Sequence, residues 1–207
     1  EELPRPHEAT PPDVLHLHED RGSVDLAEHH LLGFCGALRA GSTNRLLMHE
    51  ARRLFDPVQF THADLRLPLF DEDIEINQGF PAGVVTLHAQ IAAADAVVIA
   101  TPEYNKSIPG GLKNALDWVS RIRGNPWRDK PVAIISAADG RAGGDRSQFA
   151  LRLAMVPFRA RVLPGPEVMV AHSREAFGDD GRLKDDRYTK ALGELMTLLR
   201  AEISRSR

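Results

Sequence analysis

The chain has 207 residues and a formal net charge of −3, with 43% hydrophobic and 27% charged residues. Such a chain is long and apolar enough for one α/β domain with a buried core, so global disorder is excluded. The near-neutral charge excludes an overall basic field for nucleic acid or for an anionic membrane. The single cysteine, Cys35, excludes an internal disulfide framework.

Residues 1–29 differ in composition from the rest of the chain, because they hold four prolines, many acidic residues and several histidines. The histidine spacing fits no zinc pattern, so we favour a solvated polar segment over a metal site. We therefore expect a polar N-terminal extension over 1–29 and one domain over 30–207. The chain shows no signal-peptide pattern and no apolar run of membrane-spanning length, which favours a cytoplasmic protein.

Apolar strands and helical stripes alternate from residue 30 onward. The runs 95–100 and 131–137 are continuously apolar, as in strands buried on both faces. The five expected strands cover 31–36, 58–62, 95–100, 131–137 and 168–171. Apolar residues at helical spacing predict five helices, with stripes at Leu47, Ala51, Leu54 and Phe55; Val84, Leu87 and Ile91; Leu112, Leu116 and Val119; Phe149, Leu153 and Val156; and Leu192, Leu195, Leu199 and Ile203.

This alternation predicts an α/β fold with a doubly wound, mostly parallel sheet and helices on both faces. Pro164 and Pro166 lie just before the last expected strand, which suits an edge position. In such sheets ligands bind beyond the carboxyl ends of the strands. The loops that follow the strands are therefore the places to look for a site.

The first of these loops suits a phosphate group. Residues 36–44 read Gly-Ala-Leu-Arg-Ala-Gly-Ser-Thr-Asn and lead directly into a helix. They form neither a Walker A loop nor a G-x-G-x-x-G fingerprint. A helix N-terminus with hydroxyl donors and Arg39 favours one terminal phosphate. The alternative for Ser42 or Asn44 is a simple helix cap.

The next two loops suit a flat ring. Residues 101–111 hold two prolines and two glycines, and Tyr104 and Asn105 add a ring and an amide. A rigid loop of this kind can recognise the edge of a heteroaromatic ring, and an ordinary turn is the alternative. Residues 136–144 are rich in glycine, which lets a ligand approach the backbone closely and serves a plain turn equally well.

Four stretches resemble the NADPH-dependent FMN reductase family, which includes quinone, chromate and azo-dye reductases. They are 36–47, 65–73, 101–118 and the Gly143-Gly144 turn. The most specific stretch is 101–118, where Pro-Glu-Tyr-Asn precedes Ser-x-Pro-Gly and Leu-Lys-Asn-Ala-Leu-Asp-Trp. The resemblance spans about 31–199 and implies a flavodoxin-like three-layer sandwich with bound FMN and a five-stranded parallel sheet of order 2-1-3-4-5.

The resemblance also implies which residues bind FMN. The first loop would hold the phosphate, the second would line the isoalloxazine, and the third would close the other side of the ring. The implied cofactor-binding residues are Leu38, Arg39, Ser42, Thr43, Asn44, Pro102, Glu103, Tyr104, Asn105, Ser136, Ala138, Asp139 and Gly140. Ala37 stands where the family usually has a serine, which implies either weaker FMN binding or compensation by neighbouring donors.

The implied activity is an oxidoreductase in which FMN carries the chemistry between NADPH or NADH and a second acceptor. That acceptor would be a quinone, a flavin, an azo dye or a metal oxyanion, and we name no catalytic side chain and no metal. Arg39 is the charge best suited to a second phosphate. The alternatives are a flavodoxin-like electron carrier, against which the modest charge counts, and a scaffold domain without flavin.

The resemblance further implies a homodimer or homotetramer that forms through the helices near the second loop. Asp117 and Arg121 lie on the helix that follows this loop, and we expect them to pair across the interface. Small-molecule acceptors are the other expected partners, with no nucleic acid and no membrane insertion.

Overall fold

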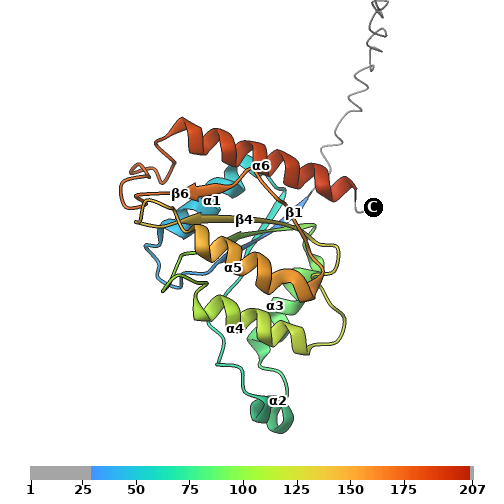
Figure 1. Ribbon diagram of the computed structural model, residues 1–207. Coiled ribbons are helices and arrows are strands. Elements are labelled where there is room, and N and C mark those ends of the chain that lie inside the picture. Colours follow the sequence, from blue (N-terminus) through green and yellow to red (C-terminus); the bar gives the residue numbers. More distant parts are fainter. Residues whose placement is uncertain (1–28, 206–207) are drawn as a thin grey trace, which may run out of the picture.

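The structure of the protein is a computed structural model that describes residues 29–205 (Figure 1). The expected N-terminal extension, except for His29, lies outside these residues. The strands are β1 (His30–Cys35), β2 (Gln59–His62), β3 (Ala96–Ala100), β4 (Pro131–Ala137), β5 (Arg161–Val162) and β6 (Val168–Val170). All paired strands are parallel, in the order β2-β1-β3-β4-β5, which confirms the expected 2-1-3-4-5 sheet.

Two short strands share the fifth position of the sheet. β5 pairs with the start of β4, and β6 pairs with its end. The segment between them contains Pro164 and Pro166. Proline has no N–H to donate to a strand ladder, so the edge strand is interrupted at this segment.

Helices cover both faces of the sheet. They are α1 (Thr43–Phe55), α2 (Glu72–Gln78), α3 (Ala82–Ala93), α4 (Gly110–Arg121), α5 (Asp145–Met155) and α6 (Asp186–Ser204), with a 3-10 turn, η1 (Val156–Phe158), after α5. α1 and α6 pack on one face and α3, α4 and α5 on the other (Figure 1). The loops after the strands gather at one end of the sheet, on the left of Figure 1.

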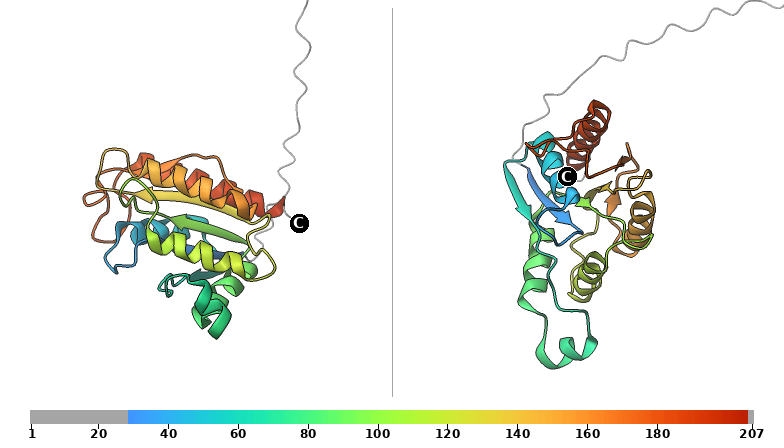
Figure 2. Two further views of the ribbon diagram at one scale, coloured as in Figure 1. Left: turned by 60° about the horizontal axis from the view of Figure 1, so that its bottom comes forward. Right: turned by 90° about the vertical axis from the view of Figure 1, so that its left-hand side faces the viewer.

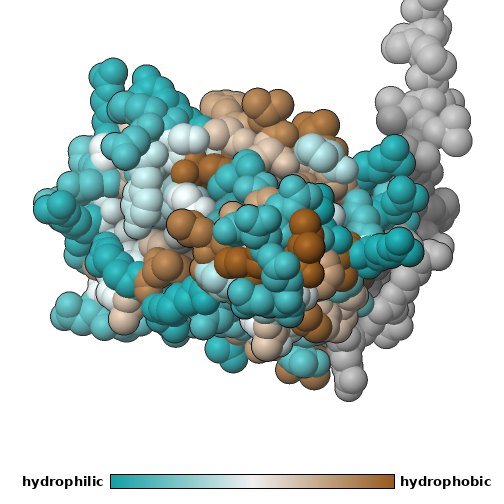
Figure 3. Space-filling model, turned by 90° about the horizontal axis from the view of Figure 1, so that it is seen from below, coloured by the Kyte–Doolittle hydropathy of each residue, from teal (hydrophilic) through white to brown (hydrophobic). Residues whose placement is uncertain are grey.

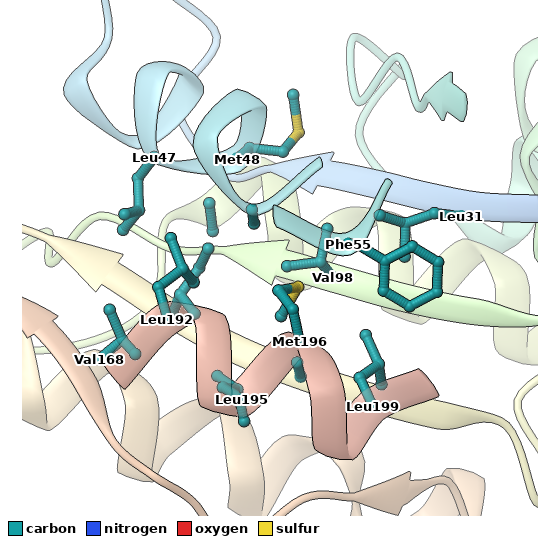
Figure 4. Packing of buried hydrophobic residues seen from close by; sticks show 14 of the residues in the cluster. Leu31, Leu47, Met48, Phe55, Val98, Val168, Leu192, Leu195, Met196 and Leu199 are labelled. Atoms are coloured by element: carbon teal, nitrogen blue, oxygen red, sulfur yellow. The ribbon is translucent and has the colours of Figure 1, made fainter. Parts of the chain in front are cut away.

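Alternate residues of the central strands enter opposite cores. Leu31 and Val98 face α1 and α6, where Leu47, Leu192 and Met196 enclose them (Figure 4). Their neighbours along the strands belong to the second core beneath α3, α4 and α5. Because side chains point to opposite faces with a period of two, both cores are filled by continuous apolar runs.

The prediction of the buried stripe of the fourth helix, which is α5 in the structure, is wrong. Phe149, Leu153 and Val156 are 57%, 75% and 67% exposed, and Val156 lies in η1. The buried face of α5 instead combines Leu151 and Met155 with polar residues. Hydrophobic spacing cannot identify this face, because two of its buried side chains, Ser147 and Gln148, are polar and are satisfied by hydrogen bonds.

The sequence did not predict α2, which has no buried residue and lies on an arm that extends from the sheet (Figures 1 and 2). The buried Trp118 holds the base of this arm by donating from Nε1 to the Pro68 carbonyl at 2.8 Å. Arg121 pairs with Glu75 of α2 at 2.7 Å, and Asp117 pairs with Lys113. Both residues expected to pair across an interface therefore have partners within the chain.

Candidate functional site

The loop after β1 presents free donors at the start of α1. A Cβ on Gly36 would lie only 2.8 Å from Cγ of Pro109, so glycine is required where the two loops touch. Arg39 is exposed, and its guanidinium donates to the Gly41 carbonyl. Within the described residues, the N–H groups of 38–40 donate to no other protein group. An anion placed here would meet these N–H groups and a cation together.

Ser42 and Asn44 have different tasks at this helix start. Ser42 Oγ accepts from the Asn44 N–H at 3.2 Å, which confirms Ser42 as the N-cap, and the same side chain also interacts with the Cys35 thiol. The Asn44 side chain donates to the carbonyl of Ala137 at 2.7 Å and accepts from its N–H at 2.9 Å. Asn44 therefore ties α1 to the end of β4.

The loop after β3 forms a narrow hairpin. Tyr104 and Ser107 exchange two backbone hydrogen bonds of 3.0 Å. Between them, Asn105 and Lys106 have φ angles of 49° and 67°. A two-residue hairpin turn demands these left-handed angles, which asparagine tolerates and lysine rarely adopts. The rigid loop expected from the sequence is thus present, with Lys106 at its tip.

The loop after β4 is tied at both ends. Ala138 donates its N–H to the Val170 carbonyl at 3.0 Å, and the buried Ser136 donates from Oγ to the Gly143 carbonyl at 2.7 Å. Gly143 has a φ of 61°, and a Cβ there would lie 2.3 Å from the carbonyl oxygen of Met169. A glycine is needed for this approach to β6, while 139–142 stay exposed.

These loops enclose a cavity of about 190 Å³ at the carboxyl ends of the strands, which we call the inner cavity. Residues from all three expected loops line it. They are Arg39, Ser42, Thr43, Asn44, Pro102, Glu103, Tyr104, Ala138 and Asp139. The structure therefore brings most of the expected binding residues to one place.

The other four expected residues lie outside the inner cavity. Gly140 lines a neighbouring cavity, and Leu38 lines a separate polar cavity of about 250 Å³ beside the ends of β1 and β2. Ser136 is fully buried beneath its loop, and Asn105 is exposed at the hairpin tip.

A larger cavity of about 650 Å³ adjoins the inner one, and we call it the outer cavity. It opens between the 104–107 hairpin and the 138–146 loop. The two cavities share Glu103, Ala138 and Asp139. Together they form one depression with a small end beside the start of α1 and a wider, more polar end between the two loops.

Sequence reasoning missed Ser173 and Arg174, which also line the inner cavity. Thr43 donates from Oγ1 to Ser173 Oγ at 3.3 Å, and Arg174 pairs with Asp139 at 3.3 Å. A signal for both was available, because they follow closely on the last strand and strand ends meet at one edge of a parallel sheet.

The chemistry of the inner cavity fits FMN. Arg39, Ser42 and Thr43 line it where α1 begins, and a cation beside a helix N-terminus favours one phosphate. Glu103 Oε2 is buried at the junction of the two cavities with no hydrogen-bond partner in the described chain. A buried acceptor without a donor is costly, and a ligand N–H or an ordered water would satisfy it.

Two titratable groups near the first loop have shifted pKa values. Burial raises the pKa of the Cys35 thiol, so Cys35 is a core residue rather than a nucleophile. Burial, and then the charge of Arg45, lower the pKa of His62. Within residues 29–205, no cluster of histidine, cysteine and carboxylate side chains could hold a metal ion. No helix in that range could cross a membrane.

Comparisons with known proteins agree with this geometry. Residues 30–175 match the family model for NADPH-dependent FMN reductase. The chain is 41% identical over 179 residues to an NAD(P)H-dependent FMN reductase of Pseudomonas aeruginosa, an alignment that covers 86% of this chain and 96% of the relative. It is 43% identical over 137 residues to a quinone reductase of Escherichia coli, which covers 65% and 73%.

A solved structure supports the same relationship. The NAD(P)H:(acceptor) oxidoreductase FerB of Paracoccus denitrificans superimposes with a TM-score of 0.77 at 30% identity. The match covers 86% of this chain and 98% of that one. By fold, by site and by sequence, the chain belongs to the NADPH-dependent FMN reductase family.

Proposed function

We propose that the protein is an FMN-dependent NAD(P)H oxidoreductase whose acceptor is a quinone. The observation that carries the proposal is the pairing of a phosphate-binding loop with an adjoining open cavity at one end of the sheet. A relative of similar sequence is a quinone reductase, which supports the choice of acceptor.

When bound, FMN would supply the redox chemistry between the nicotinamide and the acceptor. The chain's residues bind and orient. Arg39, Ser42 and the N–H groups of 38–40 would hold the phosphate, and Pro102 and Tyr104 would line the ring. The ties at Asn44 and Ser136 hold the third loop in place. We assign no side chain the role of a catalytic acid or base.

The test is steady-state oxidation of NADPH and NADH by the FMN-loaded protein with a quinone as acceptor. We expect turnover with the quinone, and an Arg39→Gln variant with FMN affinity at least about tenfold lower, since it loses a charge-assisted bond. Arg128→Gln is the matched control, because Arg128 is exposed at the opposite end of the strands. A protein that binds FMN but oxidises no nicotinamide would instead be an electron carrier.

We also propose that the protein is a homodimer or homotetramer and acts in the cytoplasm. Exposed apolar side chains on α5 and η1, including Leu153 at 75%, lie beside a groove of about 620 Å³ between the ends of α4 and α5. Figure 3 shows that apolar side chains also gather in patches on the side of the molecule that faces down in Figure 1. Such surfaces favour a protein contact. Sedimentation should show an oligomer that Leu153→Glu dissociates, and a monomeric wild type would contradict this proposal.

A further inference from the structure

The rim of the outer cavity carries cationic side chains that form no ion pair with a carboxylate of the described chain. Lys106 stands at the hairpin tip, Arg141 lies on the loop opposite, and Arg146 lies in the first turn of α5. None of the three has an ion-pair partner in the part of the chain that the structure describes. By contrast, Arg174 at the inner cavity is paired with Asp139.

Two of the three acidic residues that line the outer cavity, Asp139 and Asp145, are already engaged, and the third, Glu103, forms no ion pair with the rim cations in the described chain. Asp139 accepts from Arg174, and Asp145 Oδ1 accepts from the backbone N–H of Arg146 at 2.8 Å. The three rim side chains are exposed, so they can turn toward a ligand in the cavity. All three are cationic hydrogen-bond donors that have no ion-pair partner in the described chain.

The rim cations are also separate from the FMN phosphate loop. Arg39 lines only the inner cavity, whereas Lys106, Arg141 and Arg146 line only the outer one. The two cavities together carry five cationic and three acidic side chains, in a chain of net charge −3. Such a local excess attracts anions. It favours a second phosphate-bearing ligand beside FMN.

The backbone of Lys106 supports a role for its side chain. Its φ of 67° is sterically unfavourable for lysine, and glycine is the usual residue at the second position of such a hairpin turn. Residues in such backbone conformations cluster at active sites and ligand-binding loops. The hairpin directs a long cation to the mouth of the outer cavity.

We propose that Lys106, Arg141 and Arg146 bind the 2′-phosphate of NADPH and thereby select NADPH over NADH. The inference rests on the proposed function, which brings the coenzyme into the outer cavity. NADPH differs from NADH only by its 2′-phosphate. Arginine binds such a group with paired charge-assisted hydrogen bonds, and lysine binds it as a point charge.

The first test compares coenzymes in the FMN-loaded protein. The triple variant K106Q/R141Q/R146Q should lose about tenfold or more in kcat/KM for NADPH, because it loses charge-assisted bonds to phosphate. The value for NADH should change by less than about threefold, with the FMN content unchanged. Added salt should lower kcat/KM for NADPH more than for NADH in the wild type and erase that difference in the variant.

The second test measures binding without turnover. Adenosine 2′,5′-bisphosphate and AMP are titrated calorimetrically into the FMN-loaded protein. The wild type should bind the bisphosphate at least about tenfold more tightly than AMP, and the triple variant should bind both alike. Arg128→Gln, at the far end of the sheet, should keep the wild-type preference.

The outcomes separate the two proposals. An active wild type that uses both coenzymes equally, or a triple variant that loses both equally, overturns the inference alone. Loss of FMN from the triple variant also overturns it, because the rim would then serve the flavin. A wild type with bound FMN that no nicotinamide reduces overturns the proposed function and this inference with it.

Discussion

Individual residues at the site act mostly by holding backbone in place. Asn44 shows why sequence alone could not separate binding from support. An asparagine at a helix start reads equally as a cap or a ligand, yet here its amide is committed to both polar groups of Ala137. Only the contact between α1 and β4, which lie far apart in sequence, reveals this.

Asn44→Ala should destabilise the protein by about 1–3 kcal/mol, because it leaves two buried backbone groups of Ala137 without partners. Asn77→Ala is the control, since its hydrogen bond to Asp73 is exposed. Its effect should stay within about 0.5 kcal/mol. Urea unfolding of the three proteins measures both values. Equal losses in the two variants would show that Asn44 is not the tie we describe.

Gly143→Ala should disturb the third loop, because the added Cβ would lie 2.3 Å from the Met169 carbonyl at a φ of 61°. We expect lower FMN occupancy and a lower melting temperature. Gly193→Ala, on α6 and away from the site, is the control, with no atom within 4 Å of its added Cβ. FMN content measured by absorbance checks the pair, and unchanged occupancy in Gly143→Ala would count against the arrangement.

His62 should make stability depend on pH. Its pKa is lowered from 6.5 by burial and by Arg45, so near and below that pH the unfolded chain binds more protons than the folded one. Stability should therefore fall as the pH drops from about 7.5 to 5.5, and less steeply in His62→Gln. Urea midpoints across this range measure the slopes. Identical slopes in both proteins would contradict the assignment.

At the scale of elements, hydrophobic patterns predicted the strands and helices that contribute apolar side chains to a core. β3 and β4 read as continuous apolar runs because helices cover both faces of the sheet. The face of α5 was misjudged because Gln148 and Ser147 are buried through hydrogen bonds to neighbouring backbone carbonyls. α2 was missed because it has no buried face, so no apolar period marks it.

Helix α6 offers a direct test of the core that it forms with α1 and the sheet, which Figure 4 shows. Leu195→Ala removes a side chain that is 1% exposed and should cost about 2–5 kcal/mol. Leu198→Ala, on the same helix but 43% exposed, should cost less than about 1 kcal/mol. Denaturant unfolding of both variants measures the difference. Similar costs would mean that α6 packs with another face inward.

At the scale of the whole molecule, the sheet brings loops distant in sequence to one edge. The site was largely predictable, because a parallel sheet gathers the carboxyl ends of its strands. Ser173 and Arg174 were missed since their loop has no distinctive composition. The rim cations were missed too, since the absence of carboxylate partners among the described residues is visible only in three dimensions.

The most direct test of the whole account is an anaerobic titration of the FMN-loaded protein with NADPH, followed by flavin absorbance. We predict that the protein binds one FMN per chain, that about one equivalent of NADPH bleaches it, and that a quinone restores the colour. A protein that takes up no FMN, or whose flavin stays oxidised with both NADPH and NADH, would contradict the account.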